Sequence, residues 1–264
     1  MIVDTHAHIF SASGRFMPGA RYRPGYDAKL EDWIALWPQA GVTHGVLVQP
    51  SFFGTDNSEM LTALDAFPGK LRAVVVIDTS VSKAQLRQWD RIGVRGVRLN
   101  LIGIADFSVF GSPEWARVFA WMAELGWHLE VQCEGERMAS LFSALPNVPV
   151  TLVIDHFGLP NPEEDDVCAG VRAMFQEARR RRVYVKLSAP YRLRGADAGK
   201  YAALYHDELG AERLLWGTDW PWTNHESDRS YPGCMDMLHA WVPSPQSRDI
   251  ILHRTPDALF RFAD

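Results

Sequence analysis

Short runs of aliphatic and β-branched residues alternate with longer amphipathic segments along the chain. Several of these runs are apolar almost throughout, which is typical of strands that are buried on both faces. Between them, apolar residues recur at helical spacing, as at Trp115, Val118 and Met122. The pattern predicts eight strands, which are Ile2–Thr5, Gly45–Gln49, Leu71–Ile77, Val94–Leu99, His128–Gln132, Thr151–Ile154, Val183–Leu187 and Leu214–Trp216.

Eight strands that alternate with helices over about 250 residues are typical of a (β/α)8 barrel, the TIM barrel. A doubly wound sheet is the alternative, but no Gly-x-Gly-x-x-Gly motif follows the first strand. The chain shows no linker, low-complexity segment or internal repeat. We therefore expect a single barrel domain over residues 1–264, with long loops at Pro160–Asp166 and Trp220–Pro232.

Four titratable residues follow the predicted strands at matching ends. His6 and His8 come just past the first strand, His156 follows the sixth, and Asp219 follows the eighth. Residues two apart on an extended segment face the same side, so both early imidazoles can enter one space. Each residue alone is commonly a structural or turn residue. Together, at the carboxyl ends of barrel strands, they predict one shared site.

Further polar residues are expected around the same mouth. Arg98 lies at the end of the fourth strand and Arg192 in the loop after the seventh, and guanidinium groups bind carboxylates through paired hydrogen bonds. Gln132 ends the fifth strand, whereas His128 begins it and should lie toward the opposite face. Tyr191 and Ser51 are weaker candidates for the mouth. The remaining histidines read as surface or structural residues: His44, His206, His225, His239 and His253.

Composition excludes several classes of partner. The 264 residues carry a net charge of −5 with a pI near 6.0, so no basic footprint for nucleic acid is present. No apolar run approaches the ~18 residues needed to span a bilayer. The first residues lack the pattern of a signal peptide, and three cysteines without metal-type spacing indicate a reduced, cytoplasmic setting. We expect a small acidic substrate, and the pattern indicates no particular oligomeric state.

These residues resemble the amidohydrolase superfamily. The finer resemblance is to its amidohydrolase 2 branch, and there to the 2-pyrone-4,6-dicarboxylate lactonases and related sugar and muconolactone lactonases. The likeness runs from residue 1 to about residue 262. The segments that carry it are Asp4–His8, Gln49–Ser51, Gly54–Asn57, Gly96–Asn100, Ile154–Gly158, Lys186–Arg192, Gly217–Pro221 and Thr255–Phe260.

The resemblance implies hydrolysis of a small acidic lactone, from the breakdown of an aromatic compound or a sugar acid. Asp219 would accept a proton from the attacking water. His6, His8 and His156 would polarise the carbonyl and hold the oxyanion. Arg98 and Arg192 would then be the anchors for substrate carboxylates.

The chain also departs from the superfamily pattern. Members with two metals carry a Lys or Glu after strand four and a His after strand five, where this chain has Arg98–Asn100 and Gln132. The resemblance therefore implies no binuclear centre. Either no cofactor is required, or one divalent cation, zinc or manganese, is held by four ligands: His6, His8, His156 and Asp219.

Two other functions are carried forward. A metal-dependent decarboxylase of the same superfamily would use the same four ligands on a carboxylated aromatic ring, but such enzymes usually place a His where Gln132 stands. A barrel that binds a small ligand without catalysis is the third possibility. The dicarboxylate lactonases also carry an Arg shortly after strand four, where this chain has Leu101–Ile104. That difference predicts a substrate with fewer carboxylates or with an apolar part.

Overall fold

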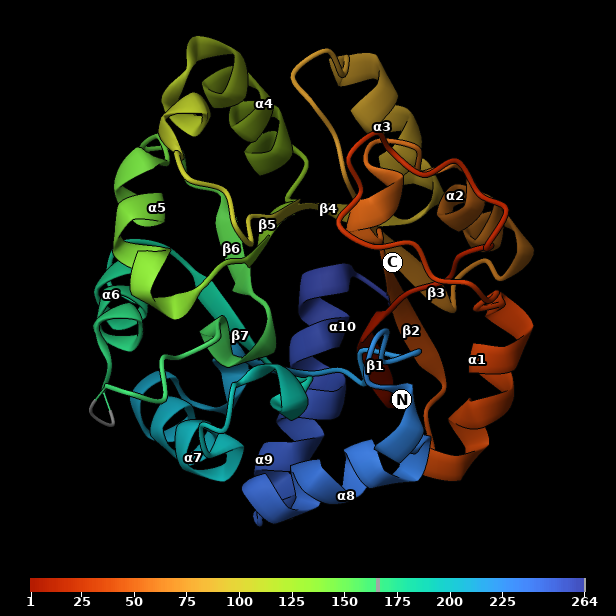
Figure 1. Cartoon of the computed structure of the whole chain (residues 1–264), viewed down its shortest axis with the longest axis vertical. Helices are drawn as coiled ribbons and strands as arrows, with labels where there is room; N and C mark the ends of the chain where they lie inside the picture. Colours follow the sequence, from red (N-terminus) through yellow and green to blue (C-terminus); the bar gives the residue numbers. More distant parts are fainter. Residues whose placement is uncertain (165–166, 264) are drawn as a thin grey trace.

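The computed structural model describes residues 1–164 and 167–263, so the end of the expected loop Pro160–Asp166 lies outside it. Its described part contains eight strands in one parallel sheet, in the order β1 to β8. Helices separate the strands and surround them (Figure 1), which confirms the predicted (β/α)8 barrel. The strands are β1 Val3–Ala7, β2 His44–Val48, β3 Leu71–Val75, β4 Val94–Asn100, β5 His128–Gln132, β6 Thr151–Ile154, β7 Val183–Leu187 and β8 Leu214–Trp216.

The outer layer consists of helices whose apolar stripes pack on the strands. α4, for example, buries Trp115, Val118, Phe119 and Met122 against the barrel. The α-helices of the described residues are α1 Leu30–Leu36, α2 Ser58–Ala66, α3 Lys83–Ile92, α4 Pro113–Glu124, α5 Met138–Ala144, α6 Ala169–Ala178, α7 Ala198–Leu209, α8 Tyr231–Trp241, α9 Pro245–Asp249 and α10 Thr255–Phe260. None of these helices is long and apolar enough to cross a lipid bilayer.

The first strand extends further than the sequence pattern indicates. β1 ends at Ala7 and not at Thr5, so His6 lies within the strand and His8 directly after it. The barrel closes at this strand, because the Asp219 amide donates to the His6 carbonyl at 2.8 Å and the His8 amide donates to the Trp220 carbonyl at 2.8 Å. Closure therefore brings the end of β1 next to the segment that follows β8.

The opposite end of the barrel is covered by α10, which lies at the centre of the ring of strands in Figure 1. The carbonyl of Phe260 accepts hydrogen bonds from Arg72 at 3.0 Å and Arg95 at 3.1 Å, both at the amino-terminal ends of strands. The ring of Phe260 packs edge-on against the ring of His128, with 5.2 Å between the ring centroids. His128 thus lies toward the face away from the mouth, as expected.

The buried His128 ring requires a glycine beside it. A Cβ added at Gly96 on β4 would lie 2.6 Å from two atoms of that ring, which is fully buried and packed on Phe260. We expect Gly96→Ala to lower the free energy of unfolding by about 1–3 kcal/mol, because the crowded core has no room to relax. Urea denaturation measures the loss. Gly25→Ala is the control, because a Cβ there meets no atom of the described residues within 4 Å, and equal effects of the two changes would contradict this account.

Candidate active site

A cavity of about 580 Å³ opens at the carboxyl ends of the strands. Eight of the nine residues expected at the site line it: His8, Ser51, Arg98, Gln132, His156, Tyr191, Arg192 and Asp219. The ninth, His6, lies just beneath, fully buried, with its Nε2 atom 3.2 Å from Nε2 of His8. His225, which the sequence indicates as a surface or structural residue, is exposed but also lines this cavity. The barrel therefore brings all nine residues to one place.

Asp219 is the centre of the arrangement, and its two carboxylate oxygens have different surroundings. Oδ2 accepts hydrogen bonds from the Tyr191 hydroxyl at 2.6 Å and the Arg192 Nε at 2.9 Å. Oδ1 has no hydrogen-bond partner among the described residues, although it is buried. Three imidazole Nε2 atoms surround it, those of His6 at 3.5 Å, His8 at 3.4 Å and His156 at 3.8 Å.

Local backbone geometry turns these side chains into the mouth. His156 and Asp219 have positive φ angles of 51° and 60°, uncommon for residues with a side chain, at the turns that follow β6 and β8. The buried Asp4 of β1 fixes the second turn, because its carboxylate accepts from the amide of Thr218 at 2.9 Å and from its hydroxyl at 2.7 Å. Strand ends and sharp turns thus place the groups before any ligand arrives.

The hydrogen-bond partner of His8 fixes the position of its proton, whereas the partner of His156 allows either position. His8 Nδ1 lies 2.7 Å from the Val48 carbonyl oxygen, which can only accept, so this nitrogen carries the proton. In neutral His8 the Nε2 lone pair therefore faces His6 and Asp219. His156 Nδ1 lies 2.9 Å from the Ser188 hydroxyl, a group that can donate or accept. His156 Nε2 can consequently carry a proton or a lone pair toward the cavity.

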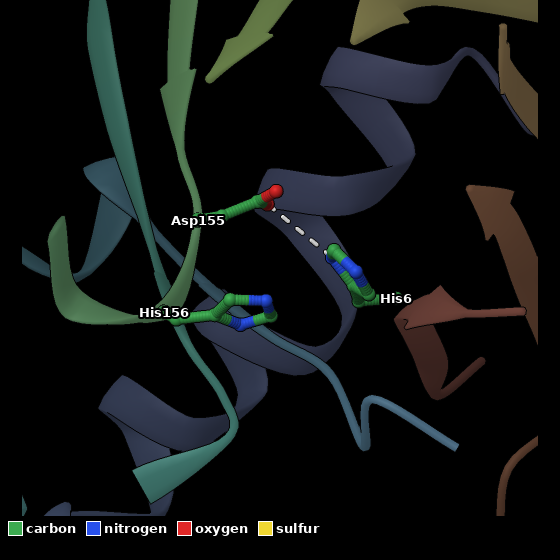
Figure 2. Close-up of side chains that lie close together, drawn as sticks. All are labelled: His6, Asp155 and His156. Atoms are coloured by element: carbon green, nitrogen blue, oxygen red, sulfur yellow. Dashed lines mark ion pairs between the residues drawn. The ribbon is translucent and has the colours of Figure 1, made fainter. Parts of the chain in front are cut away.

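Beneath the histidines lies a cluster of buried charges that the sequence analysis did not single out. Lys186 of β7 contacts Glu130 of β5 at 2.5 Å, Asp155 at 3.5 Å and Nδ1 of His6 at 3.0 Å. His6 also pairs with Asp155 at 3.3 Å, and His156 points toward the same space (Figure 2). Arg98 completes the cluster through Asp155, at 3.0 Å. Two cations therefore balance two carboxylates around a single imidazole.

The electrostatics of this cluster decide which groups are charged. Burial raises the pKa of Asp155, but Lys186 and Arg98 outweigh burial, and the net pKa lies below its ordinary value. Burial likewise opposes ionisation of Asp219, and the charge of Arg192 nevertheless holds the pKa of that carboxyl well below its usual range. Burial lowers the pKa of His156 to about 4. At neutral pH the site therefore combines ionised carboxylates with a neutral His156.

Arg98 is tied into the wall of the cavity. Its Nε donates to Asp155 at 3.0 Å and its Nη2 donates to the Gln132 amide oxygen at 2.7 Å. The same oxygen accepts from the Asn100 amide at 2.9 Å, so three strand-end side chains form one network. Arg98 is almost fully buried, at 3% exposure, although it lines the cavity. Arg192 is more accessible, with 23% of its side chain exposed.

The donor set around Asp219 fits one divalent cation. Three imidazole nitrogens and one carboxylate oxygen are the ligands that zinc accepts in proteins. Oδ1 of Asp219 is a buried acceptor without a partner among the described residues, and His6, His8 and Asp219 converge closely enough to share an ion. Two more such acceptors, Glu130 Oε1 and Asp155 Oδ1, lie 3.6 and 3.3 Å from His6 Nδ1, where they could accept its proton.

The chain matches the amidohydrolase family model over residues 3–262. It belongs to the amidohydrolase family. The match covers every strand of the barrel and every residue of the expected site, which agrees with the resemblance found in the sequence. In a family with many reactions, the particular chemistry must be argued from the site.

Among curated amidohydrolase relatives, the 2-pyrone-4,6-dicarboxylate hydrolase of Comamonas testosteroni is 31% identical, covering 98% of this chain and 89% of the relative. A 4-sulfomuconolactone hydrolase of Hydrogenophaga intermedia is 26% identical, covering 97% and 88%. A crystal structure from Pseudomonas putida, assigned as a 2-pyrone-4,6-dicarboxylic acid hydrolase, is 38% identical with a TM-score of 0.89, covering 99% and 97%. A manganese-bound dihydroxybenzoic acid decarboxylase from Polaromonas, 12% identical with a TM-score of 0.71 and coverage of 100% and 97%, shares the fold alone.

Removal of Lys186 should expose the dependence of the fold on the charge cluster. Lys186→Met leaves Glu130 and Asp155 with one fewer buried cation, so we expect a loss of about 3–5 kcal/mol in the free energy of unfolding. Denaturant unfolding measures it. Lys83→Met, which breaks a partly exposed pair with Glu124, is the control and should change stability by no more than about 1 kcal/mol.

The double variant Lys186→Met/Glu130→Gln tests the cause of that loss. Because the side-chain amide introduced at position 130 would carry no charge, less uncompensated charge stays buried, and the double variant should be more stable than Lys186→Met alone. A double variant that is less stable than Lys186→Met would show that lost packing, not unbalanced charge, explains the result.

Proposed function

We propose that this amidohydrolase opens a small acidic lactone by attack of a water molecule that Asp219 activates. The observation that carries the proposal is the difference in surroundings between the two carboxylate oxygens of Asp219. One oxygen, Oδ2, is held by Arg192 and Tyr191. The other, Oδ1, lies near the Nε2 atoms of three imidazoles and has no hydrogen-bond partner in the described part of the chain. An ionised carboxylate with a free oxygen is the group that can orient a water and take its proton.

The reaction balances with this one carboxylate. Water adds to the lactone carbonyl carbon, its proton passes to Asp219 Oδ1, and the carbonyl oxygen becomes an oxyanion. When the intermediate collapses, the ring C–O bond breaks and Asp219 returns the proton to the departing oxygen. The low pKa of Asp219 makes its protonated form a strong acid, which suits this second step.

His156 is the imidazole best placed to polarise the carbonyl. If Lys186 donates to His6 Nδ1, then His6 Nε2 donates to His8 Nε2, and His8 Nδ1 donates to the Val48 carbonyl. In this arrangement neither of the two early histidines has a free N–H for substrate. His156 can accept from Ser188 and direct its own Nε2–H into the cavity, where the oxyanion would form.

Acidic substrates are favoured by the cations around the cavity. Arg192 lines it with an accessible guanidinium, and Arg98 and Gln132 form its wall. Two relatives are named as hydrolases of 2-pyrone-4,6-dicarboxylate and of 4-sulfomuconolactone, which are anionic lactones. Their names support the same class of substrate for this chain. When a divalent cation is bound by His6, His8, His156 and Asp219, it would supply Lewis acidity to the same carbonyl.

A decarboxylase is the second candidate, because the same four ligands fit one divalent cation. The decarboxylase from Polaromonas shares only the fold with this chain, and its manganese belongs to that protein. The proposed lactone opening uses the ionised Asp219 and the neutral His156 directly, whereas the decarboxylase hypothesis is supported only by the four possible metal ligands. The site therefore supports hydrolysis better.

Asp219→Asn tests the proposed base. An amide cannot accept the proton of the attacking water, so we expect kcat for lactone hydrolysis to fall by about 10²–10⁴. A panel should include 2-pyrone-4,6-dicarboxylate, its analogue with one carboxylate and a sugar-acid lactone. Asp236→Asn, an exposed position on α8, is the control. Unchanged hydrolysis by Asp219→Asn would exclude the base role.

Chelation separates the two candidate functions. Hydrolysis driven by Asp219 and His156 should survive exhaustive treatment with EDTA, because both groups act without a cation in the proposed steps. A decarboxylase of the metal-dependent type would instead lose all turnover of 2,6-dihydroxybenzoate and regain it with added manganese. Metal content by mass spectrometry accompanies both assays, and lactone hydrolysis abolished by EDTA would contradict this expectation.

A further inference from the structure

Four arginines line the cavity, and three of them are paired with carboxylates. The pairs are Arg98 with Asp155, Arg192 with Asp219 and Arg194 with Glu136, at 3.0, 2.9 and 3.3 Å. The fourth arginine, Arg21, comes from the segment between β1 and α1. It has no ion pair with any carboxylate in the described part of the chain, so its positive charge is not neutralised by a neighbour there.

The partners of Arg21 are neutral acceptors. Its Nη2 donates to the Asn100 amide oxygen at 2.9 Å and its Nη1 donates to the Ile102 carbonyl at 3.4 Å. A guanidinium has five N–H donors, so most of them stay available. Asn100 is itself anchored, because its amide nitrogen donates to Gln132 at 2.9 Å. The charge of Arg21 is therefore held at a defined position on the cavity wall.

That position lies across the barrel from the proposed base. Asn100 ends β4, and Asp219 follows β8. In a barrel whose strands are ordered β1 to β8, these two strands stand on opposite sides. A ligand with its reacting carbonyl beside Asp219 would extend toward Arg21 with its far end.

Glu134 also lines the cavity, and its negative charge could repel an anion bound at Arg21. Its Oε1 accepts the Gly103 amide at 2.8 Å, and its Oε2 lies 3.9 Å from the Arg137 guanidinium. Glu134 is thus engaged by the loop after β4 and by a neighbouring cation. Its charge does not cancel that of Arg21.

We propose that Arg21 binds a second anionic group of the substrate, a carboxylate or a comparable oxyanion, at a subsite over β4. The inference rests on the proposed lactone hydrolysis and adds Arg21 as a residue that would select a lactone with two anionic groups. The sequence expectation of fewer carboxylates rested on Leu101–Ile104, which carries no arginine. Arg21 reaches the same loop from a segment 79 residues away from Asn100 along the chain.

A substrate pair tests the subsite. The ratio of kcat/KM for the pyrone lactone with two carboxylates to that for its one-carboxylate analogue should fall about 10–100-fold in Arg21→Met, because a charge-assisted pair is lost. Arg21→Lys keeps the charge and should recover part of the ratio. Arg23→Met is the matched control on the same segment, since Arg23 stacks on Phe16 and does not line the cavity.

A binding measurement keeps the test independent of turnover. Isothermal titration calorimetry with benzene-1,3-dicarboxylate and with benzoate reports the same preference without hydrolysis. We expect Arg21→Met to lower the preference for the dicarboxylate at least about tenfold and Arg23→Met to preserve it.

The outcomes separate the two proposals. An Arg21-dependent preference for the dicarboxylate in a protein that hydrolyses no lactone would support the subsite and reject the proposed reaction. Hydrolysis with a substrate ratio and a ligand preference that Arg21→Met leaves unchanged would overturn the subsite and retain the reaction. Equal weakening of both ligands and both substrates would also overturn it, because a second-anion contact must discriminate between them.

Discussion

The ion pair between Arg192 and Asp219 is the interaction on which the site depends. A carboxylate buried at the mouth of a barrel would ordinarily take up a proton, because burial disfavours its charge. The guanidinium and the Tyr191 hydroxyl both bind one oxygen of Asp219, so the carboxylate stays ionised, while the other oxygen has no hydrogen-bond partner within residues 1–164 and 167–263. In the proposed hydrolase, the asymmetry of this one side chain would supply the base, and the same oxygen could equally serve as a ligand atom for a cation.

The alternation of apolar runs and amphipathic segments predicted the barrel, and four strands, β5 to β8, agree with the structure at both ends. The end of β1 was wrong by two residues. The cause is physical: the last residues of barrel strands point into the mouth and are polar there. His6 is a fully buried strand residue, yet as a polar residue it interrupts the run by which a strand is recognised, so the predicted strand stopped at Thr5.

The same rule, polar residues at strand ends, found the residues of the mouth, but it could not find the charges beneath them. Lys186 and Glu130 lie inside apolar strands, where a charged residue reads as one facing solvent. Their contact joins residues 56 positions apart, and only the closed barrel brings them together. Arg21 was missed for a similar reason, because its loop carries no periodic pattern and its partners belong to β4 and the loop that follows it.

In the proposed hydrolase, recognition and basicity are linked through Arg192. The guanidinium that holds Asp219 also lines the cavity, so an anionic group of the substrate competes with Asp219 for it. Sharing the cation weakens the stabilisation of the Asp219 carboxylate and raises its pKa, since a nearby positive charge favours the ionised form. Asp219 is then a stronger base in the complex than in the free enzyme. A neutral lactone would leave the pair intact and meet a weaker base, so the preference for acidic substrates would act on the chemical step as well as on binding.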